Sequence, residues 1–230
     1  MEIGEYNVST IDFPGIPSLV IFLAGCPLRC PYCHNPELID GGRKVPLTDI
    51  YKKISESKDM VDAIVISGGE PLMQIDELEK VLEFAKSLNL KTKLDTNGYW
   101  PEYIERIKWL LDYVALDVKA PFEEYKRLFG FDGARVRESM EILSKSEIFL
   151  ECRTTYVPGL LKPLDIVRIA SQINCNLYVI QQFRNKMVYD PKLKGVDPPS
   201  PSLLRDIAIK AKEYCENVKI RTQEFGEEKI

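Results

Sequence analysis

The sequence predicts an α/β protein built as an open, partial (β/α)6 barrel with parallel strands. Six apolar runs rich in branched and aromatic residues, typical of buried strands, recur along the chain. A helical pattern or a long loop follows each run, which favours a parallel sheet with right-handed crossovers. A closed barrel has eight such units in about 250 residues. This chain has 230 residues and too few units, so the barrel should remain open.

The predicted strands and helices alternate along the chain in a regular order. The six strands are expected at residues 18–25, 61–67, 91–94, 113–119, 148–157 and 176–183, with a further short strand at 218–221. Apolar residues at helical spacing predict helices at 47–54, 75–88, 101–111, 123–129, 134–145, 164–173 and 202–215. Thr48 is the expected N-cap of the first helix. The proline-rich segment 190–201 is the clearest loop.

The chain is expected to form one domain over residues 1–230. Its length suits one sizeable core, and we find no internal repeat and no low-complexity linker. Within this domain, residues 1–17 are a turn-rich lead-in to the first strand. Residues 184–230 form a C-terminal loop, helix and short strand.

Composition excludes several classes of partner. A net charge of −4 without a run of Lys or Arg argues against a broad nucleic-acid footprint. No apolar segment reaches the length of a membrane span, and the first residues do not have the pattern of a signal peptide. Of six cysteines, three share one loop and three are scattered, which indicates a reducing compartment. We therefore expect a cytoplasmic protein with neither a nucleic-acid nor a membrane partner.

The loop after the first strand contains Cys26, Cys30 and Cys33 at the spacing Cys-x3-Cys-x2-Cys. Three thiolates on one short loop, held open by prolines, indicate a metal site. Zinc prefers a fourth ligand in a closed tetrahedron, and His34, the only histidine, adjoins Cys33 and would turn back onto the same ion with difficulty. An iron–sulfur cube can take three cysteines and leave one iron free for a ligand. Structural zinc and inert core cysteines are the alternatives.

Polar clusters sit at the ends of the next strands, where parallel α/β folds bind their ligands. The clusters are Gly68-Gly69-Glu70-Pro71, Asp95-Thr96-Asn97-Gly98, the pair Asp117 and Lys119, and Arg153 within the fifth strand. Paired glycines allow the backbone to approach a ligand closely. Taken one at a time, each cluster has a plain structural interpretation as a turn, a cap or a solvated strand end.

Taken together, the cysteine spacing and Gly68-Gly69-Glu70-Pro71 one strand later resemble the radical S-adenosylmethionine (radical SAM) enzymes. Asp95-Thr96-Asn97-Gly98 and Leu116-Asp117-Val118-Lys119 resemble stretches of the glycyl-radical enzyme activating enzymes within that superfamily. The resemblance runs from Ser9 to about Phe183. Some activators insert further cysteines for extra clusters, and residues 35–60 contain none. The chain is thus most similar to the short anaerobic ribonucleoside-triphosphate reductase activating proteins.

The resemblance implies a [4Fe-4S] cluster on Cys26, Cys30 and Cys33, whose open iron is chelated by S-adenosylmethionine. The implied cofactor-binding residues lie on the cysteine loop and on four later strands: Tyr32, Cys33, His34, Gly68, Gly69, Glu70, Asp95, Thr96, Asp117, Val118, Lys119 and Arg153. In this scheme the glycine motif holds the methionine amino group. The two aspartates and Thr96 surround its carboxylate, directly or through a monovalent cation. Tyr32 and His34 are next to the adenine.

The implied activity is reductive cleavage of S-adenosylmethionine to a 5′-deoxyadenosyl radical. This radical abstracts hydrogen from a glycine of a partner glycyl-radical enzyme, by resemblance an anaerobic ribonucleotide reductase. A low-potential donor of the flavodoxin or ferredoxin type supplies the electron, and segment 190–201 is a candidate contact for the partner enzyme. A radical SAM enzyme acting on a small molecule or peptide is the alternative, followed by a zinc-binding module. The remaining Cys152, Cys175 and Cys215 are interpreted as small buried apolar residues.

Overall fold

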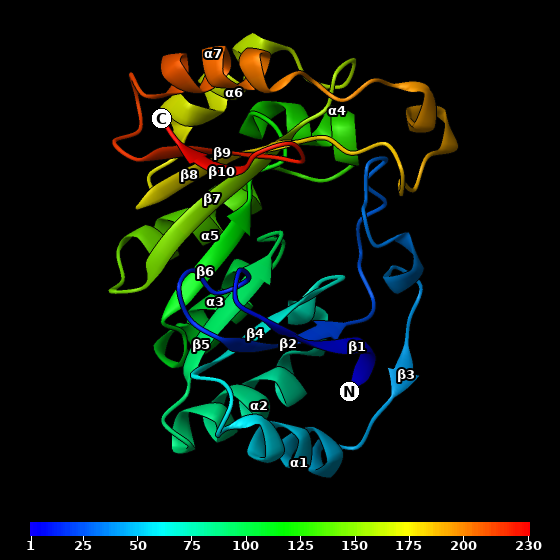
Figure 1. Cartoon of the computed structure of the whole chain (residues 1–230), viewed down its shortest axis with the longest axis vertical. Coiled ribbons are helices and arrows are strands. Elements are labelled where there is room, and N and C mark those ends of the chain that lie inside the picture. Colours follow the sequence, from blue (N-terminus) through cyan, green and yellow to red (C-terminus); the bar gives the residue numbers. More distant parts are fainter.

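One curved sheet of ten strands runs through the computed structural model, which describes residues 1–230, in the order β10-β9-β8-β7-β6-β5-β4-β2-β1-β3 (Figure 1). Its seven central strands pair in parallel: β2 Ser18–Leu23, β4 Ala63–Gly68, β5 Lys91–Thr96, β6 Tyr113–Asp117, β7 Phe149–Tyr156, β8 Leu177–Gln182 and β9 Val218–Thr222. The predicted α/β class and parallel sheet are confirmed, and each predicted strand is present.

Three strands at or next to the edges of the sheet were not predicted. Residues 2–9, interpreted from sequence as part of a turn-rich lead-in, form β1 (Glu2–Ser9), which pairs antiparallel with β2. Two short strands, β3 (Arg43–Lys44) and β10 (Gly226–Lys229), pair antiparallel with β1 and β9. Their side chains are mostly polar and exposed, because an edge strand has little apolar surface to bury, and so they lack a strong sequence pattern.

The helices pack on the convex face of the sheet, with α1 and α2 at one end and α6 and α7 at the other (Figure 1). Their bounds are α1 Leu47–Ser57, α2 Ile75–Ser87, α3 Pro101–Ile107, α4 Tyr125–Phe129, α5 Ala134–Ser144, α6 Pro163–Gln172 and α7 Pro201–Ala211. Thr48 lies inside the first turn of α1, after Pro46 at the N-cap, so its predicted capping role is wrong. Segment 190–201 contains one short 3₁₀ helix, Pro191–Gly195. None of the helices has the length and apolar character needed to cross a membrane.

The two faces of the sheet pack against different parts of the chain. Alternate residues of each strand face the helices and join helix residues in a cluster of 49 buried apolar residues. The concave face holds a smaller cluster of six, in which Phe13 from the lead-in packs 5.5 Å from the ring of Tyr113. The Lys93 ammonium donates to the Asp12 carbonyl at 2.7 Å and fixes the lead-in across this face. The carboxyl ends of the strands therefore stay open to the concave side.

Candidate functional site

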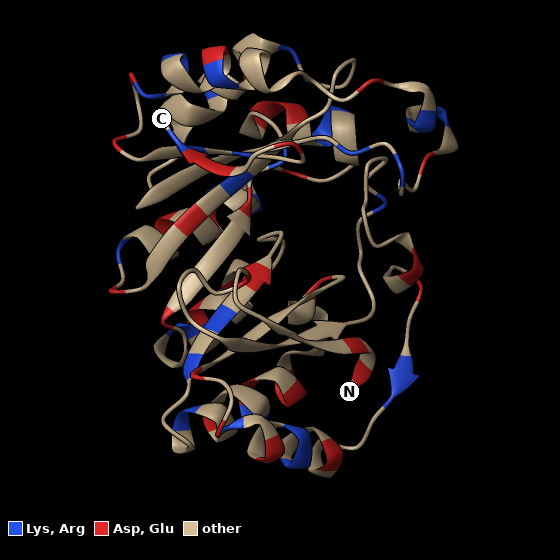
Figure 2. Cartoon of the chain, viewed as in Figure 1, with Lys and Arg blue, Asp and Glu red and all other residues tan.

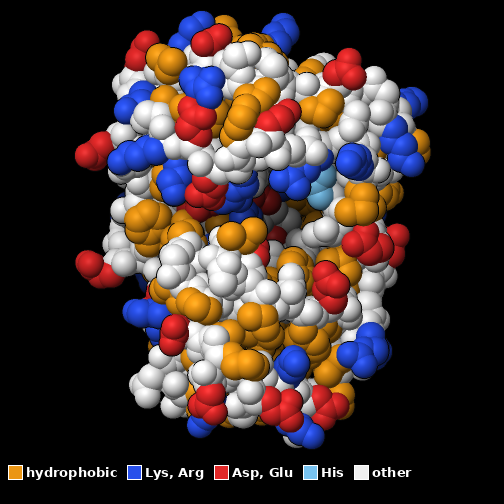
Figure 3. Space-filling view, in the orientation of Figure 1, with side chains coloured by type: hydrophobic (Ala, Val, Ile, Leu, Met, Phe, Trp, Pro, Cys, Tyr) orange, Lys and Arg blue, Asp and Glu red, His pale blue; other side chains and the backbone are white.

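A pocket of about 390 Å³ opens at the carboxyl ends of the parallel strands. In the space-filling view it appears as a hollow across the middle of the molecule, with the single histidine at its edge (Figure 3). Its lining comes from the cysteine loop and from β4, β5, β6, β7 and β8. This volume is in the range of pockets that bind small organic cofactors.

The cysteine loop follows β2 and is held by main-chain hydrogen bonds. The amide of Gly25, whose φ is +92°, donates to Leu38 O at 2.7 Å, and the amide of Cys26 donates to Ile39 O at 3.1 Å. A turn closed by the amide of Cys33 and the carbonyl of Cys30, at 3.0 Å, sets the spacing of the last two thiols. All three cysteines line the pocket with free thiols. The loop thus brings together the residues that the sequence selected.

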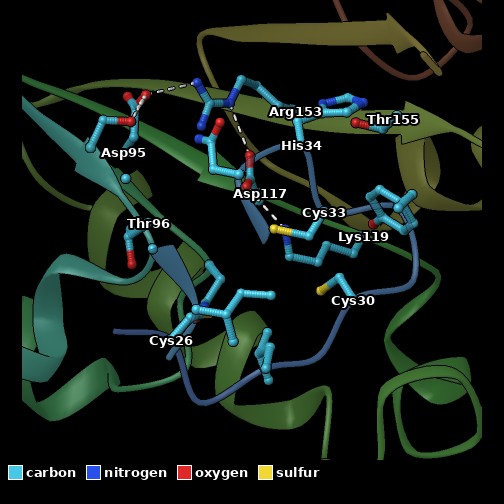
Figure 4. Close-up of a pocket in the computed structure, with 18 of the residues that line it drawn as sticks. Cys26, Cys30, Cys33, His34, Asp95, Thr96, Asp117, Lys119, Arg153 and Thr155 are labelled. Carbon is cyan, nitrogen blue, oxygen red and sulfur yellow. Dashed lines mark hydrogen bonds and ion pairs between the residues drawn. The ribbon is translucent and has the colours of Figure 1, made fainter. Parts of the chain in front are cut away.

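The surroundings of the three thiols suit the binding of a positively charged group. Burial raises the pKa of Cys26 to about 12 and also raises the pKa of Cys30 and Cys33, while the nearby Lys119 cation acts in the opposite direction. Figure 4 shows the sulfurs of Cys30 and Cys33 beside the Lys119 side chain. Metal binding replaces thiol protons, so a soft cation is the species that this set of donors can hold.

The fourth position does not come from histidine. His34 lines the pocket, but its ring points away from the three cysteines (Figure 4). Burial and the Arg184 cation lower the pKa of His34, which favours the neutral ring, and its buried Nε2 has no hydrogen-bond partner. A closed zinc tetrahedron with His34 is therefore not formed by this arrangement. Three thiols with an open side fit a [4Fe-4S] cluster that keeps one iron free.

A wall of alternating charges faces the cysteine loop across the pocket. Arg153 on β7 donates to Asp95 Oδ2 at 3.1 Å and to Asp117 Oδ1 at 2.9 Å, and Lys119 Nζ lies 3.0 Å from Asp117 Oδ2 (Figure 4). Lys93 Nζ lies 2.8 Å from the other oxygen of Asp95. The parallel register places Asp117 directly beside Arg153, which explains why strands distant in sequence supply one network.

Each group in this wall is charged. Burial favours the neutral form of Asp95 and Asp117, but Arg153 with Lys93 or Lys119 outweighs it and lowers the pKa of both carboxyls. Burial likewise disfavours the cations, yet the carboxylates hold the pKa of Arg153 and Lys119 well above their usual range. The wall can therefore orient a zwitterionic ligand by its two ends.

The two glycines of Gly68-Gly69-Glu70-Pro71 line the pocket and also brace the cysteine loop. Gly68 has φ +113°, and a Cβ there would overlap the carbonyl of Leu23. A Cβ at Gly69 would overlap the carbonyl of Gly25, so both positions require glycine for this close approach. The amides of Gly69 and Glu70 donate to Leu23 O and Gly25 O, both at 2.8 Å.

Glu70 and Val118 lie behind the pocket wall. The Glu70 side chain is fully buried and accepts hydrogen bonds from Leu72 N at 3.1 Å, Thr96 Oγ1 at 2.8 Å and Asn97 N at 2.7 Å. Burial raises the pKa of Glu70 to about 7 against these three hydrogen bonds, which favour the carboxylate. Val118 packs its side chain in the core. Both side chains position the wall, and neither lines the cavity.

Several lining residues are absent from the predicted cofactor-binding set: Asp12, Ser67, Asn97, Thr155 and Gln181. Three of these, Ser67, Asn97 and Thr155, lie two positions from a predicted site residue, so the period of two along a strand is the signal that could have found them. Gln182, at the end of β8, is buried and donates to Pro199 O at 2.9 Å. The adjoining Phe183 packs in a buried cluster with Tyr32.

The chain shares a family pattern and full-length similarity with known proteins. The pattern of the radical SAM superfamily matches residues 20–162. The chain is 41% identical to a protein of Methanocaldococcus jannaschii named as a putative glycyl-radical enzyme activating enzyme, over 95% of both chains. It is 27% identical to the pyruvate formate-lyase 1-activating enzyme of Escherichia coli, over 96% of this chain and 94% of that enzyme.

Solved structures share the fold at low sequence identity. The structure of TYW1 with a lysine-pyruvate adduct bound superposes with a TM-score of 0.69 at 16% identity, over 94% of this chain and 80% of that chain. Streptococcus suis SuiB bound to S-adenosylmethionine superposes with a TM-score of 0.66 at 16% identity, over 86% of this chain and 48% of that chain. These likenesses concern the arrangement of strands and helices.

Proposed function

The chain belongs to the radical SAM superfamily and to its glycyl-radical enzyme activating enzymes, and from this premise we propose that it generates the glycyl radical of a partner enzyme. Its cofactors are a [4Fe-4S] cluster and S-adenosylmethionine. When bound and reduced by one electron, this pair supplies a 5′-deoxyadenosyl radical. The observation that carries the proposal is the convergence of three thiols and a charged wall on one pocket.

We assign the cluster to Cys26, Cys30 and Cys33. Their loop faces the open side of the pocket, and the glycines at the end of β4 fix its first residues. Lys119 favours the thiolate form of Cys30 and Cys33 by its charge. With His34 turned away, one coordination position is left for S-adenosylmethionine.

The charged wall is assigned to the methionine end of the cofactor. Asp95 and Asp117, with Thr96, offer oxygen atoms for its amino group or for a monovalent cation that bridges to its carboxylate. Lys119 and Arg153 offer the matching positive charges. On the opposite side, the Tyr32 hydroxyl and His34 Nε2 are buried without partners, and we place the adenine and ribose there.

For the partner we propose an anaerobic ribonucleotide reductase. Residues 35–60 contain no cysteine, so this chain has the short form of activator that the sequence resembles. The glycine to be activated has to reach the pocket from the open concave side of the sheet. The pocket is open on that side, which leaves room for a protein loop.

The first test separates a radical enzyme from a metal-binding module. The protein is reconstituted anaerobically with iron and sulfide, reduced with dithionite, and assayed for 5′-deoxyadenosine. We expect cleavage that is lost in Cys30→Ala and kept in Cys175→Ala, a cysteine at the opposite end of β8. A colourless protein that holds zinc and produces no 5′-deoxyadenosine would refute the proposal.

The second test identifies the partner. The reduced enzyme is mixed with an anaerobic ribonucleotide reductase from the same genome, and the glycyl radical is measured by EPR. We expect one stable radical signal that requires S-adenosylmethionine and is lost in Cys30→Ala. Robust cofactor cleavage without any radical on the reductase would instead indicate a different partner, a peptide or a small-molecule substrate.

A further inference from the structure

The segment between β8 and α7 carries a cluster of basic side chains, Arg184, Lys186, Lys192 and Lys194, which we call the basic segment. All four are exposed, and none forms an ion pair. Asp190 is the only acidic residue among residues 184–194, whereas the chain as a whole has a net charge of −4. In Figure 2 blue positions recur along this segment at the edge of the molecule. The excess of positive charge is therefore specific to this segment and does not reflect the composition of the whole chain.

The basic segment packs directly on the outer side of the cysteine loop. The amide of Asp190 donates to Pro31 O, between Cys30 and Cys33, at 2.8 Å. Val188 is buried in a cluster with Tyr32 of the loop. These contacts hold the segment against the cysteine loop. The space-filling view shows basic side chains beside the histidine at the edge of the hollow (Figure 3).

Exposed apolar side chains lie among these charges. Met187 is 59% exposed and Tyr189 is 42% exposed. A small apolar centre with a charged rim is the usual composition of a protein docking site. Electron-transfer complexes are among the smallest protein complexes and bury less than about 1,200 Å² in total.

We propose that the basic segment is the docking site of an acidic one-electron carrier protein that reduces the cluster. The inference rests on the proposed function. One electron passes from the carrier to the cluster, so the carrier is oxidised and the cluster is reduced. No bond forms or breaks in that step. Opposite charges steer such an encounter, while the contact with the cysteine loop keeps the path to the thiols short.

The position of the segment favours the electron carrier over the glycyl-radical partner, for which sequence analysis had offered residues 190–201. No residue of 184–200 lines the pocket. A substrate glycine has to enter the pocket, whereas an electron carrier has only to approach the loop from outside. The carrier is therefore the occupant that this surface suits.

The test is a charge reversal with a matched control. The variant K186E/K192E/K194E is compared with K53E/K58E/K80E, which changes three exposed lysines in and next to α1 and α2, at the far end of the molecule (Figure 1). Two quantities are measured on reconstituted enzyme. They are the dissociation constant for an acidic flavodoxin as a function of salt, and the rate of 5′-deoxyadenosine formation with reduced flavodoxin or with dithionite.

We expect the first variant to bind flavodoxin at least about tenfold more weakly at low salt, with a flatter salt dependence, and to lose flavodoxin-driven cleavage to a similar extent. Its dithionite-driven rate should equal that of wild type, and the control should match wild type throughout. Unchanged flavodoxin binding in the first variant would overturn the inference. So would normal flavodoxin-driven cleavage with a lower glycyl-radical yield under dithionite, which would assign the segment to the substrate enzyme.

The design separates this inference from the proposed function. If wild type produces no 5′-deoxyadenosine with dithionite, the proposed function fails. If wild type cleaves with dithionite and the charge reversal has no effect on flavodoxin, only the docking site fails.

Discussion

The two faces of β5, β6 and β7 are made by alternate residues of the same strands and carry opposite chemistry. Toward the helices these strands present Leu94, Leu116 and Leu150, all fully buried in the main core. Toward the concave side they present Lys93, Asp95, Asp117, Glu151 and Arg153, of which Lys93 and Glu151 are buried and the other three are partly buried. In Figure 2 the charged positions appear as coloured bands across otherwise tan strands.

The residues that face the helices should mainly determine stability, and the residues on the concave side should mainly determine ligand binding. Burial of apolar area makes the helix-facing side the main source of folding free energy. Buried ion pairs add little net stability, because desolvation cancels most of their attraction. The concave network therefore has another role, which is to hold charges in fixed positions around a ligand. Substitutions on the two faces should have separable effects.

The largest effect is expected for Arg153→Leu. Without the guanidinium, Asp95 and Asp117 share a buried site with too little positive charge, so the unfolding free energy should fall by about 3–5 kcal/mol and cofactor cleavage should be lost. Urea unfolding and the 5′-deoxyadenosine assay measure the two effects. Arg168→Leu, which removes a partly exposed arginine paired with Glu123, should cost less than about 1 kcal/mol and leave cleavage intact. Equal losses in the two variants would contradict the comparison.

On the same strand, Leu150→Ala should affect stability alone. Leu150 is fully buried against the helices and adjoins Glu151, so the cavity should cost about 2–5 kcal/mol. Cleavage per folded molecule, measured at a temperature where both proteins are folded, should match wild type. If cleavage disappears while the circular dichroism spectrum stays native, the two faces are not separable.

Glu70 should make the folded protein less stable as pH rises, which is the opposite of the usual effect of a paired carboxyl group. Its pKa is raised to about 7 by burial, so the folded state holds the proton more tightly than the unfolded state. The stabilisation is complete below about pH 4.5 and is lost as pH rises through about 7, by up to about 3 kcal/mol. Unfolding of the cluster-free, reduced protein between pH 5 and 8 measures this slope. Glu70→Gln should flatten it, and an unchanged slope would assign the titration to another group.

The smallest effect is expected at Asp112, at the opposite end of β5 and β6. It accepts hydrogen bonds from Lys86 at 2.7 Å, Lys91 at 3.0 Å and the amide of Thr92 at 2.8 Å. Burial opposes these donors, but they prevail and lower the pKa of Asp112 to about 2, so its stabilisation is present above about pH 4 and is lost as pH falls toward 2. Asp112→Asn should cost about 1 kcal/mol at pH 7, because the pairs are partly exposed. Cleavage should be unchanged, and a loss of activity would extend the functional network to the far end of the sheet.

The central strands were predictable because they are buried on both faces. Apolar runs such as residues 18–23 and 63–66 have a pattern that few other elements share. The strand at β5 was predicted to end at Leu94 and instead continues to Thr96, because the charged side chains of Lys93 and Asp95 are in a strand interior where sequence rules expect apolar residues. The edge strand β1 was missed because its side chains are mostly polar.

The sequence could predict which strand ends supply the site, but it was less informative about the direction in which each side chain points. Cys26, Cys30 and Cys33 stood out by spacing, and Asp95, Thr96, Asp117, Lys119 and Arg153 lie on the same pocket. The inward or outward direction of a side chain at a strand end depends on local turns that the sequence does not specify. Glu70 follows two glycines and turns into the core, whereas Asp12 lines the pocket from the lead-in, a segment that Lys93 contacts through the Asp12 carbonyl.

The contact between Pro31 and Asp190 constrains the order in which the protein matures. The two residues are far apart in sequence, and their pairing closes a loop that includes most of the sheet. Such non-local contacts form late in folding, because chain entropy opposes them until the intervening elements are in place. During synthesis the cysteines leave the ribosome long before the segment that covers them. The cysteine loop thus reaches its final shape only when most of the chain has been made.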